Sequence, residues 1–86
     1  MAKVNVTLLG LFRLDSGIHQ AALEGERVRD LYAPLAALAR EKNPQTAFRA
    51  QQLSGCMIIL NGAPGRERDR LQDGDEVYLL SPVAGG

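Results

Sequence analysis

Hydrophobic and polar residues alternate over two segments near the ends of the chain, residues 3–9 and 76–80. A period of two that includes β-branched residues is typical of a half-buried strand. The positions expected to face the core are Val4, Val6, Leu8, Val77 and Leu79. The apolar positions expected to face the other way are Leu9, Tyr78 and Leu80.

Two further segments have the character of strands. Residues 18–24 follow the turn-forming tripeptide DSG at 15–17 and pair with the first strand in the predicted arrangement, although their β propensity is modest. Residues 56–60 (CMIIL) form a continuous apolar run that is too short for a helix, so we predict a buried strand. The Asn-Gly pair at 61–62 is a tight-turn signal.

Between these strands the spacing of apolar residues changes to three and four, which predicts one helix with an apolar stripe. The stripe consists of Val28, Leu31, Leu35, Leu38 and Ala39. Pro34 would kink this helix unless the helix starts late enough to place it in the first turn. Asn43-Pro44 ends the helix, and we expect residues 45–55 to form a loop with room for a short helical turn.

One helix over one face of a four-stranded sheet is an α+β two-layer domain. The length of 86 residues, with 45% hydrophobic and 23% charged residues, fits one globular domain. A formal net charge of zero argues against non-specific nucleic-acid binding. We also expect no membrane association, because no apolar run approaches the roughly 20 residues of a bilayer span. The first residues lack signal-peptide character, so a cytoplasmic location is expected.

The side chains with potential chemistry are few. The single cysteine, Cys56, lies in an apolar run and is expected to be inert packing, and it cannot form an intrachain disulfide or a cysteine-based metal site. The single histidine, His19, is expected to be structural or exposed, and residues 66–70 (RERDR) a solvated segment. Solvated turn residues are also expected at Asp73, Asp75 and Glu76. A domain this small has little room for a substrate pocket, which favours a carrier or adaptor over a free-standing enzyme.

The end of the chain is the stronger candidate. Two terminal glycines, Gly85 and Gly86, occur by chance in roughly 0.5% of chains at average glycine usage. Residues without Cβ make a slender arm that can enter a narrow channel, and Pro82 stiffens its start. A carboxylate accepts a nucleophile only after activation, for example by adenylation, and this chain has no phosphate-binding loop for ATP. A partner would have to supply that site, unless the tail is an idle, floppy end.

Leu9, Tyr78 and Leu80 would lie together on the sheet face that the helix leaves uncovered. A contiguous exposed apolar patch is typical of a partner site, so we expect a docking role there.

The last residues, DGDEVYLLSPVAGG at 73–86, resemble the C-terminal signature of the small subunits of molybdopterin synthase. Weaker matches are VNVTLLGLFR at 4–13, VRDL at 28–31 and IILNG at 58–62. That family belongs to the ubiquitin-like β-grasp sulfur carriers, which include the carrier of thiamine thiazole synthesis. The resemblance implies an α+β, ubiquitin-like β-grasp fold, with a mixed four- to five-stranded sheet and one main helix on one face. Residues 1–81 would form the domain, and residues 82–86 a flexible tail.

The resemblance also implies a cycle in which the chain has no catalytic side chain, bound cofactor or metal of its own. A ubiquitin-activating type of enzyme uses ATP to adenylate Gly86, and a sulfur donor converts it to a thiocarboxylate. The tail, with Gly85 as its slender penultimate residue, then enters the large synthase subunit and gives up sulfur for the dithiolene of molybdopterin. The positions implied to contact partners are Leu9, Tyr78, Leu80, Pro82, Val83 and Ala84.

This sequence departs from the family pattern at several positions. Ser81 replaces the usual first proline of the tail, Leu9 and Leu80 stand where the family often has phenylalanine, and residues 10–24 match weakly. Three alternatives stay open: a carrier for thiamine, cysteine or tungsten-cofactor synthesis, a ubiquitin-like modifier that forms isopeptide bonds, and an interaction domain with an idle tail.

Overall fold

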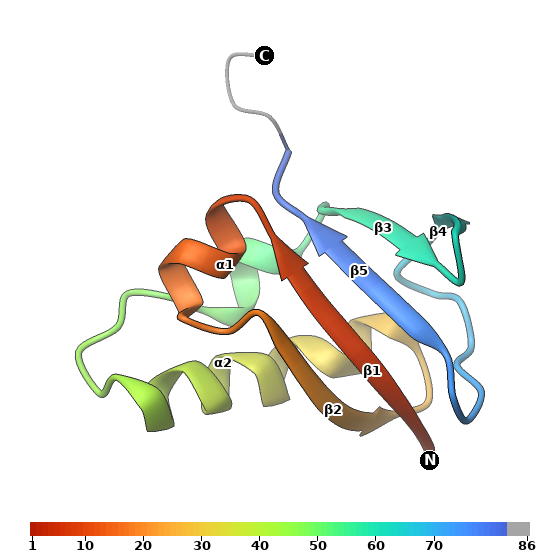
Figure 1. The fold of residues 1–86 in the computed structure, drawn as a ribbon, viewed down its shortest axis with the longest axis horizontal. Helices are drawn as coiled ribbons and strands as arrows, with labels where there is room; N and C mark the ends of the chain where they lie inside the picture. Colours follow the sequence, from red (N-terminus) through yellow and green to blue (C-terminus); the bar gives the residue numbers. More distant parts are fainter. Residues whose placement is uncertain (83–86) are drawn as a thin grey trace.

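The computed structural model describes residues 1–82. Residues 1–82 contain five strands, two α-helices and two single 3-10 turns (η1 and η2). Figure 1 shows how the strands and helices are arranged. The elements in chain order are β1 (Ala2–Leu9), α1 (Leu11–Ser16), β2 (Gln20–Gly25), η1 (Val28–Leu31), α2 (Tyr32–Lys42), η2 (Ala50–Leu53), β3 (Met57–Leu60), β4 (Ala63–Gly65) and β5 (Glu76–Leu80).

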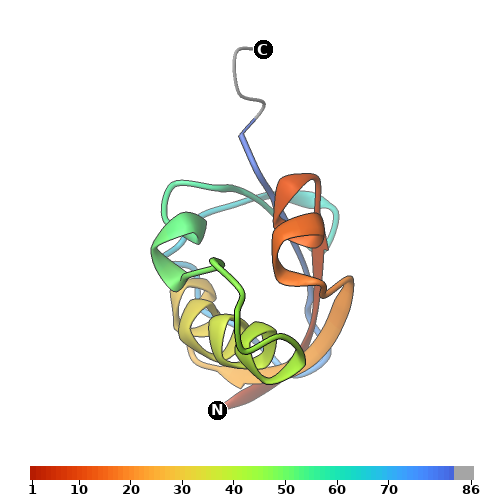
Figure 2. The same cartoon turned by 90° about the vertical axis from the view of Figure 1, so that its left-hand side faces the viewer.

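The strands form one mixed sheet in the order β2-β1-β5-β3-β4. The central pair, β1 and β5, is parallel, and its register places Val6 beside Val77 and Leu8 beside Leu79. The other pairs are antiparallel. Since the first and last strands run the same way, β5 ends at the opposite end of the molecule from the N-terminus (Figures 1 and 2). This arrangement confirms the β-grasp fold expected from the sequence.

The inward positions of β1 and β5 are the ones that alternation predicts, and each is at most 3% exposed. They pack against one continuous hydrophobic core that includes Leu31 and Leu35 from the helical layer. Phe12 of α1 meets Phe48 edge to face, with 6.4 Å between ring centroids, so α1 is joined to the same core. The inner face of the sheet and the helices packed on it therefore form the single hydrophobic core that stabilises the domain.

The predicted helix from Val28 is divided in two. Residues 28–31 form the 3-10 turn η1, in which the Arg27 backbone N–H donates to Asp30 Oδ2 at 2.9 Å, and α2 begins only at Tyr32. Pro34 is therefore the third residue of α2 and lies in its first turn, where the missing N–H does little harm. The helix ends at Lys42, directly before Asn43-Pro44, as the sequence predicts.

Two short elements differ from the sequence-based expectation. Residues 11–16, between the first two strands, form α1, and residues 63–65 form β4 at the sheet edge, where Pro64 is tolerated. The run 56–60 is not a fully buried strand, because Met57 is 53% exposed and only Ile58 of β3 is buried. The predicted turn at 61–62 is present, with positive φ at Asn61 and Gly62.

Gly10 connects β1 to α1 in a conformation that few residues other than glycine adopt, with φ of 65° and ψ of −139°. A Cβ atom at this position would lie 2.6 Å from Ser81 Oγ. The same Ser81 oxygen accepts a hydrogen bond from the Leu11 backbone N–H at 3.1 Å. The end of β5 is thus held against the start of α1.

This contact predicts that Gly10→Ala destabilises the protein by about 3 kcal/mol, because backbone strain and the clash with Ser81 add. The matched control is Gly17→Ala, which also has positive φ but open space around its Cβ position. It should lower the free energy of unfolding by only about 1 kcal/mol. Denaturant unfolding measures both values.

The double variant Gly10→Ala/Ser81→Ala separates clash from strain. We expect it to be more stable than Gly10→Ala alone, because the nearest clashing atom is removed. Equal stability of the Gly10→Ala and Gly17→Ala variants would contradict this account.

Candidate functional site

The sheet face turned away from α2 changes from polar to apolar along its strands. Along β1 the outward positions are Lys3, Asn5, Thr7 and Leu9; along β5 they are Glu76, Tyr78 and Leu80. The parallel register pairs Asn5 with Glu76, Thr7 with Tyr78 and Leu9 with Leu80. Both gradients therefore run in the same direction, and the apolar half lies at the end where β5 stops.

Strand β3 extends the apolar half. Its register places Met57 beside Leu80 and Ile59 beside Tyr78. We call the resulting group the outer-face cluster, and it consists of Leu9, Met57, Ile59, Tyr78 and Leu80. Met57 is 53% and Tyr78 36% exposed, while the other three side chains are partly buried. A contiguous accessible apolar group of this kind is suited to contact with a partner.

Polar side chains border the cluster. Gln20 Nε2 donates to Thr7 Oγ1 at 3.4 Å, and Thr7 is only 3% exposed. Asn5 Nδ2 donates to Glu76 Oε2 at 2.8 Å. These polar side chains thus form hydrogen bonds with one another, whereas the outer-face cluster exposes apolar surface.

The chain leaves the sheet beside this cluster. Ser81 is half-buried, bonded to the Leu11 N–H, and Pro82 after it is exposed. Helix α1 lies near the same end of the molecule (Figure 1), and two of its apolar residues are exposed, Leu11 by 52% and Leu14 by 77%. Through the side-chain oxygen of Ser81, this hydrogen bond holds the residue that follows β5 against the start of α1.

The expected outward orientation of Leu9, Tyr78 and Leu80 is confirmed, and the structure brings them together. Pro82 lies next to them at the surface. The expected site residues Val83, Ala84, Gly85 and Gly86 lie outside the described residues. Met57 and Ile59 are cluster members that the sequence analysis missed, because an unbroken apolar run shows no period that assigns its faces.

Cys56 belongs to a structural network. Tyr32 O–H donates to Glu67 Oε2 at 2.9 Å, and that oxygen also accepts the Gly55 N–H at 3.0 Å. Tyr32 Oη lies 3.7 Å from Cys56 Sγ. Burial is the main cause that raises the pKa of the Cys56 thiol, and the Glu67 carboxylate raises it further. A half-buried thiol with a raised pKa is a poor nucleophile, as the sequence analysis expected.

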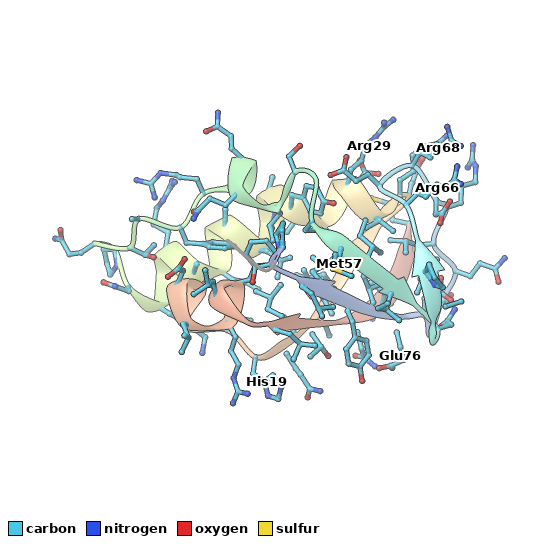
Figure 3. All side chains as sticks on the ribbon, turned by 90° about the horizontal axis from the view of Figure 1, so that it is seen from above. His19, Arg29, Met57, Arg66, Arg68 and Glu76 are labelled. Atoms are coloured by element: carbon cyan, nitrogen blue, oxygen red, sulfur yellow. The ribbon has the colours of Figure 1, made fainter. Side chains whose placement is uncertain are left out.

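The remaining candidates have local partners or are exposed. His19 is exposed at the surface (Figure 3). Asp73 accepts the Lys3 backbone N–H at 2.9 Å, and Asp75 accepts the Gln72 N–H at 2.8 Å, as expected for turn carboxylates. Among residues 1–82 no group of three His, Cys, Asp or Glu side chains is placed to hold a metal ion.

Every buried side-chain nitrogen or oxygen in residues 1–82 has a hydrogen-bond partner within the protein, so none of them needs a ligand as its partner. An open depression lies over Lys3, Ala22, Leu23 and Glu24. In the part of the chain that the structure describes, no helix has the length and apolar character needed to cross a membrane.

Comparison with solved structures shows several close matches in fold. A protein assigned as molybdopterin converting factor subunit 1 from Pyrococcus furiosus is 29% identical, with a TM-score of 0.66, over 96% of this chain and 100% of that one. Small archaeal modifier protein 1 from Methanosarcina acetivorans is 28% identical, with a TM-score of 0.70, over 100% of this chain and 98% of that one. A chain from the complex of molybdopterin-converting factor subunits 1 and 2 of Helicobacter pylori shares the fold at 24% identity and a TM-score of 0.59, covering 98% of this chain and 99% of its own.

No curated protein sequence matches this chain. The model of the ThiS family matches residues 11–86, which is most of the chain and includes its last residue. The mixed five-stranded sheet with one main helix agrees with this match. The chain therefore belongs to the ThiS family and has the ubiquitin-like β-grasp fold of the sulfur carriers.

Proposed function

We propose that the protein is a sulfur carrier in the cytoplasm and the small subunit of a molybdopterin synthase. The Gly86 carboxylate is adenylated and converted to a thiocarboxylate, whose sulfur then enters the dithiolene of molybdopterin. The chain provides the acyl group and the docking surface, and its partners provide the catalytic residues. These partners are an adenylating enzyme of the ubiquitin-activating type, which uses ATP, and the large synthase subunit.

The observation that carries the proposal is the outer-face cluster beside the point where β5 ends. Pro82, the last described residue, is followed by only four residues, which can reach at most about 14 Å. A partner that acts on Gly86 must therefore approach the end of the molecule where the cluster lies. The 29% identity to the Pyrococcus furiosus protein supports the molybdopterin pathway among the routes open to the family.

The chemistry proceeds in two substitutions. A carboxylate oxygen of Gly86 attacks the α-phosphorus of ATP and releases pyrophosphate, which leaves an acyl adenylate. A sulfur nucleophile delivered by the donor then attacks the acyl carbon and releases AMP. When the donor is a protein persulfide, this attack gives an acyl disulfide. A thiol then reduces its S–S bond, which releases the thiocarboxylate and leaves the donor sulfur in a disulfide with that thiol. Glycine at positions 85 and 86 suits this chemistry, because no Cβ obstructs the approach to the acyl carbon.

The second candidate is a ubiquitin-like modifier that forms an isopeptide bond through Gly86. The 28% identity to the small archaeal modifier protein of Methanosarcina acetivorans favours it. Both functions share the acyl adenylate and differ in the nucleophile that attacks it. Carriers for thiamine, cysteine or tungsten-cofactor synthesis also share the thiocarboxylate and differ only in the enzyme that accepts the sulfur.

Mass spectrometry of the intact protein tests the proposal. After incubation with the activating enzyme, ATP and a sulfur donor, we expect the mass to rise by one exchange of oxygen for sulfur at the C-terminus. The control is a chain with an alanine added after Gly86, which keeps the fold and blocks the slender end. If the extended chain gains sulfur equally well, Gly86 is not the acceptor; if wild type gives only lysine-linked adducts, the modifier function is correct.

A second prediction concerns the outer-face cluster. Leu80→Lys should weaken binding to the large synthase subunit encoded in the same genome by about tenfold or more. The lysine would place a charge inside an apolar contact. The matched control is Ala22→Lys, an exposed position on the polar half of the same face, which should change the affinity less than about twofold. Isothermal titration calorimetry measures both, and equal losses in the two variants would exclude the cluster as the docking surface.

A further inference from the structure

Half of the basic residues of this neutral chain gather in one place. Five of the ten lysines and arginines lie in two segments that are far apart in sequence, and all five are arginine: Arg27, Arg29, Arg66, Arg68 and Arg70. Backbone hydrogen bonds join the segments, from Val28 N–H to Asp69 C=O at 3.1 Å and from Arg29 N–H to Glu67 C=O at 3.0 Å. Arg27 and Arg70 face each other in an isolated β-bridge.

The acidic residues between these arginines turn inward. Exposure alternates along residues 66–70, so that the three arginines are exposed while Glu67 and Asp69 are half-buried. Glu67 Oε2 accepts hydrogen bonds from Tyr32 and Gly55, and Asp69 Oδ2 accepts the Arg66 backbone N–H at 2.9 Å. The sequence pattern RERDR predicts a mixed solvated segment. In the structure its two carboxylates accept hydrogen bonds from the domain, and its three guanidinium groups are exposed.

One arginine has a structural role. Arg27 is half-buried, and its Nη1 donates to the Arg68 carbonyl at 2.8 Å. Asp30 Oδ2 accepts the Arg27 backbone N–H at 2.9 Å, and Glu26, the other acidic residue of this segment, is exposed. We call the four exposed side chains that remain the arginine face, and they are Arg29, Arg66, Arg68 and Arg70.

Three of the four arginines lie across the sheet from its outward face. Figure 3 shows Arg29, Arg66 and Arg68 on one side of the ribbon, whereas Glu76, on the polar half of the outward face, lies on the other side. A partner seated on the cluster at the end of β5 would therefore leave these guanidinium groups accessible. This surface needs a separate explanation from the tail and its docking site.

We propose that the arginine face binds a carboxylate-rich segment of a second protein. Guanidinium groups pair with carboxylates through two parallel hydrogen bonds, and they lose less hydration than lysine when they do so. The alternative polyanion, a nucleic acid, presents a long array of phosphates and calls for a basic footprint over a domain. Here the charge is confined to two joined segments of a chain with no net charge, which matches a short acidic peptide.

The inference is tested on the full-length protein with hexaglutamate as the probe, at low ionic strength, by chemical shifts of the backbone amides. We expect saturable shifts confined to residues 26–30 and 65–71. The triple variant Arg29→Gln/Arg66→Gln/Arg68→Gln should bind about tenfold more weakly, from the sum of three exposed charge contacts. The matched control, Arg13→Gln/Arg40→Gln/Lys42→Gln, loses the same net charge at exposed positions elsewhere and should lose less than about twofold.

Three outcomes would overturn the proposal. Equal weakening in the two triple variants would show that only net charge matters. Shifts spread over other surfaces would show that the face is not a site. Tighter binding of a hexauridylate oligonucleotide than of hexaglutamate at this face would assign it to nucleic acid. None of these results depends on Gly86, so they leave the proposed sulfur chemistry unaffected.

Discussion

The parallel pairing of β1 with β5 is the constraint on which the rest of the structure depends. It joins the first and last strands at the centre of the sheet, with Val6 beside Val77 and Leu8 beside Leu79. All four side chains are fully buried. The same register aligns Leu9 with Leu80 on the other face. A shift by one residue would exchange the two faces, burying polar residues and exposing the core. The core therefore fixes which side chains surround the end of β5.

The two faces of the sheet therefore differ in what they can contact. The inner face of the sheet packs into the core, and the outer face is the one that the proposed function assigns to contact with other proteins. In the proposed function the reactive group is the Gly86 carboxylate, and the domain has only to present it. The hydrogen bond from the Leu11 N–H to Ser81 Oγ holds the chain in place directly after β5.

The two faces of β1 could be predicted from the sequence. The alternation of Val4, Val6 and Leu8 predicts the buried face and, with it, the outward position of Leu9, which the structure confirms. Other features could not. The six residues of α1 are too few to establish a helical period, and the apolar run of β3 hides the exposed Met57. The arginine face depends on backbone pairing between residues 27–29 and 67–70, which no local pattern reveals.

The account is tested most directly by the amide hydrogen-exchange map of the protein in complex with the large synthase subunit. It predicts new protection at the ends of β1 and β5 and at the start of β3, with residues 26–30 and 66–70 unchanged by that subunit. Protection centred on α2 or on β2, with the ends of β1 and β5 exchanging as in the free protein, would contradict it.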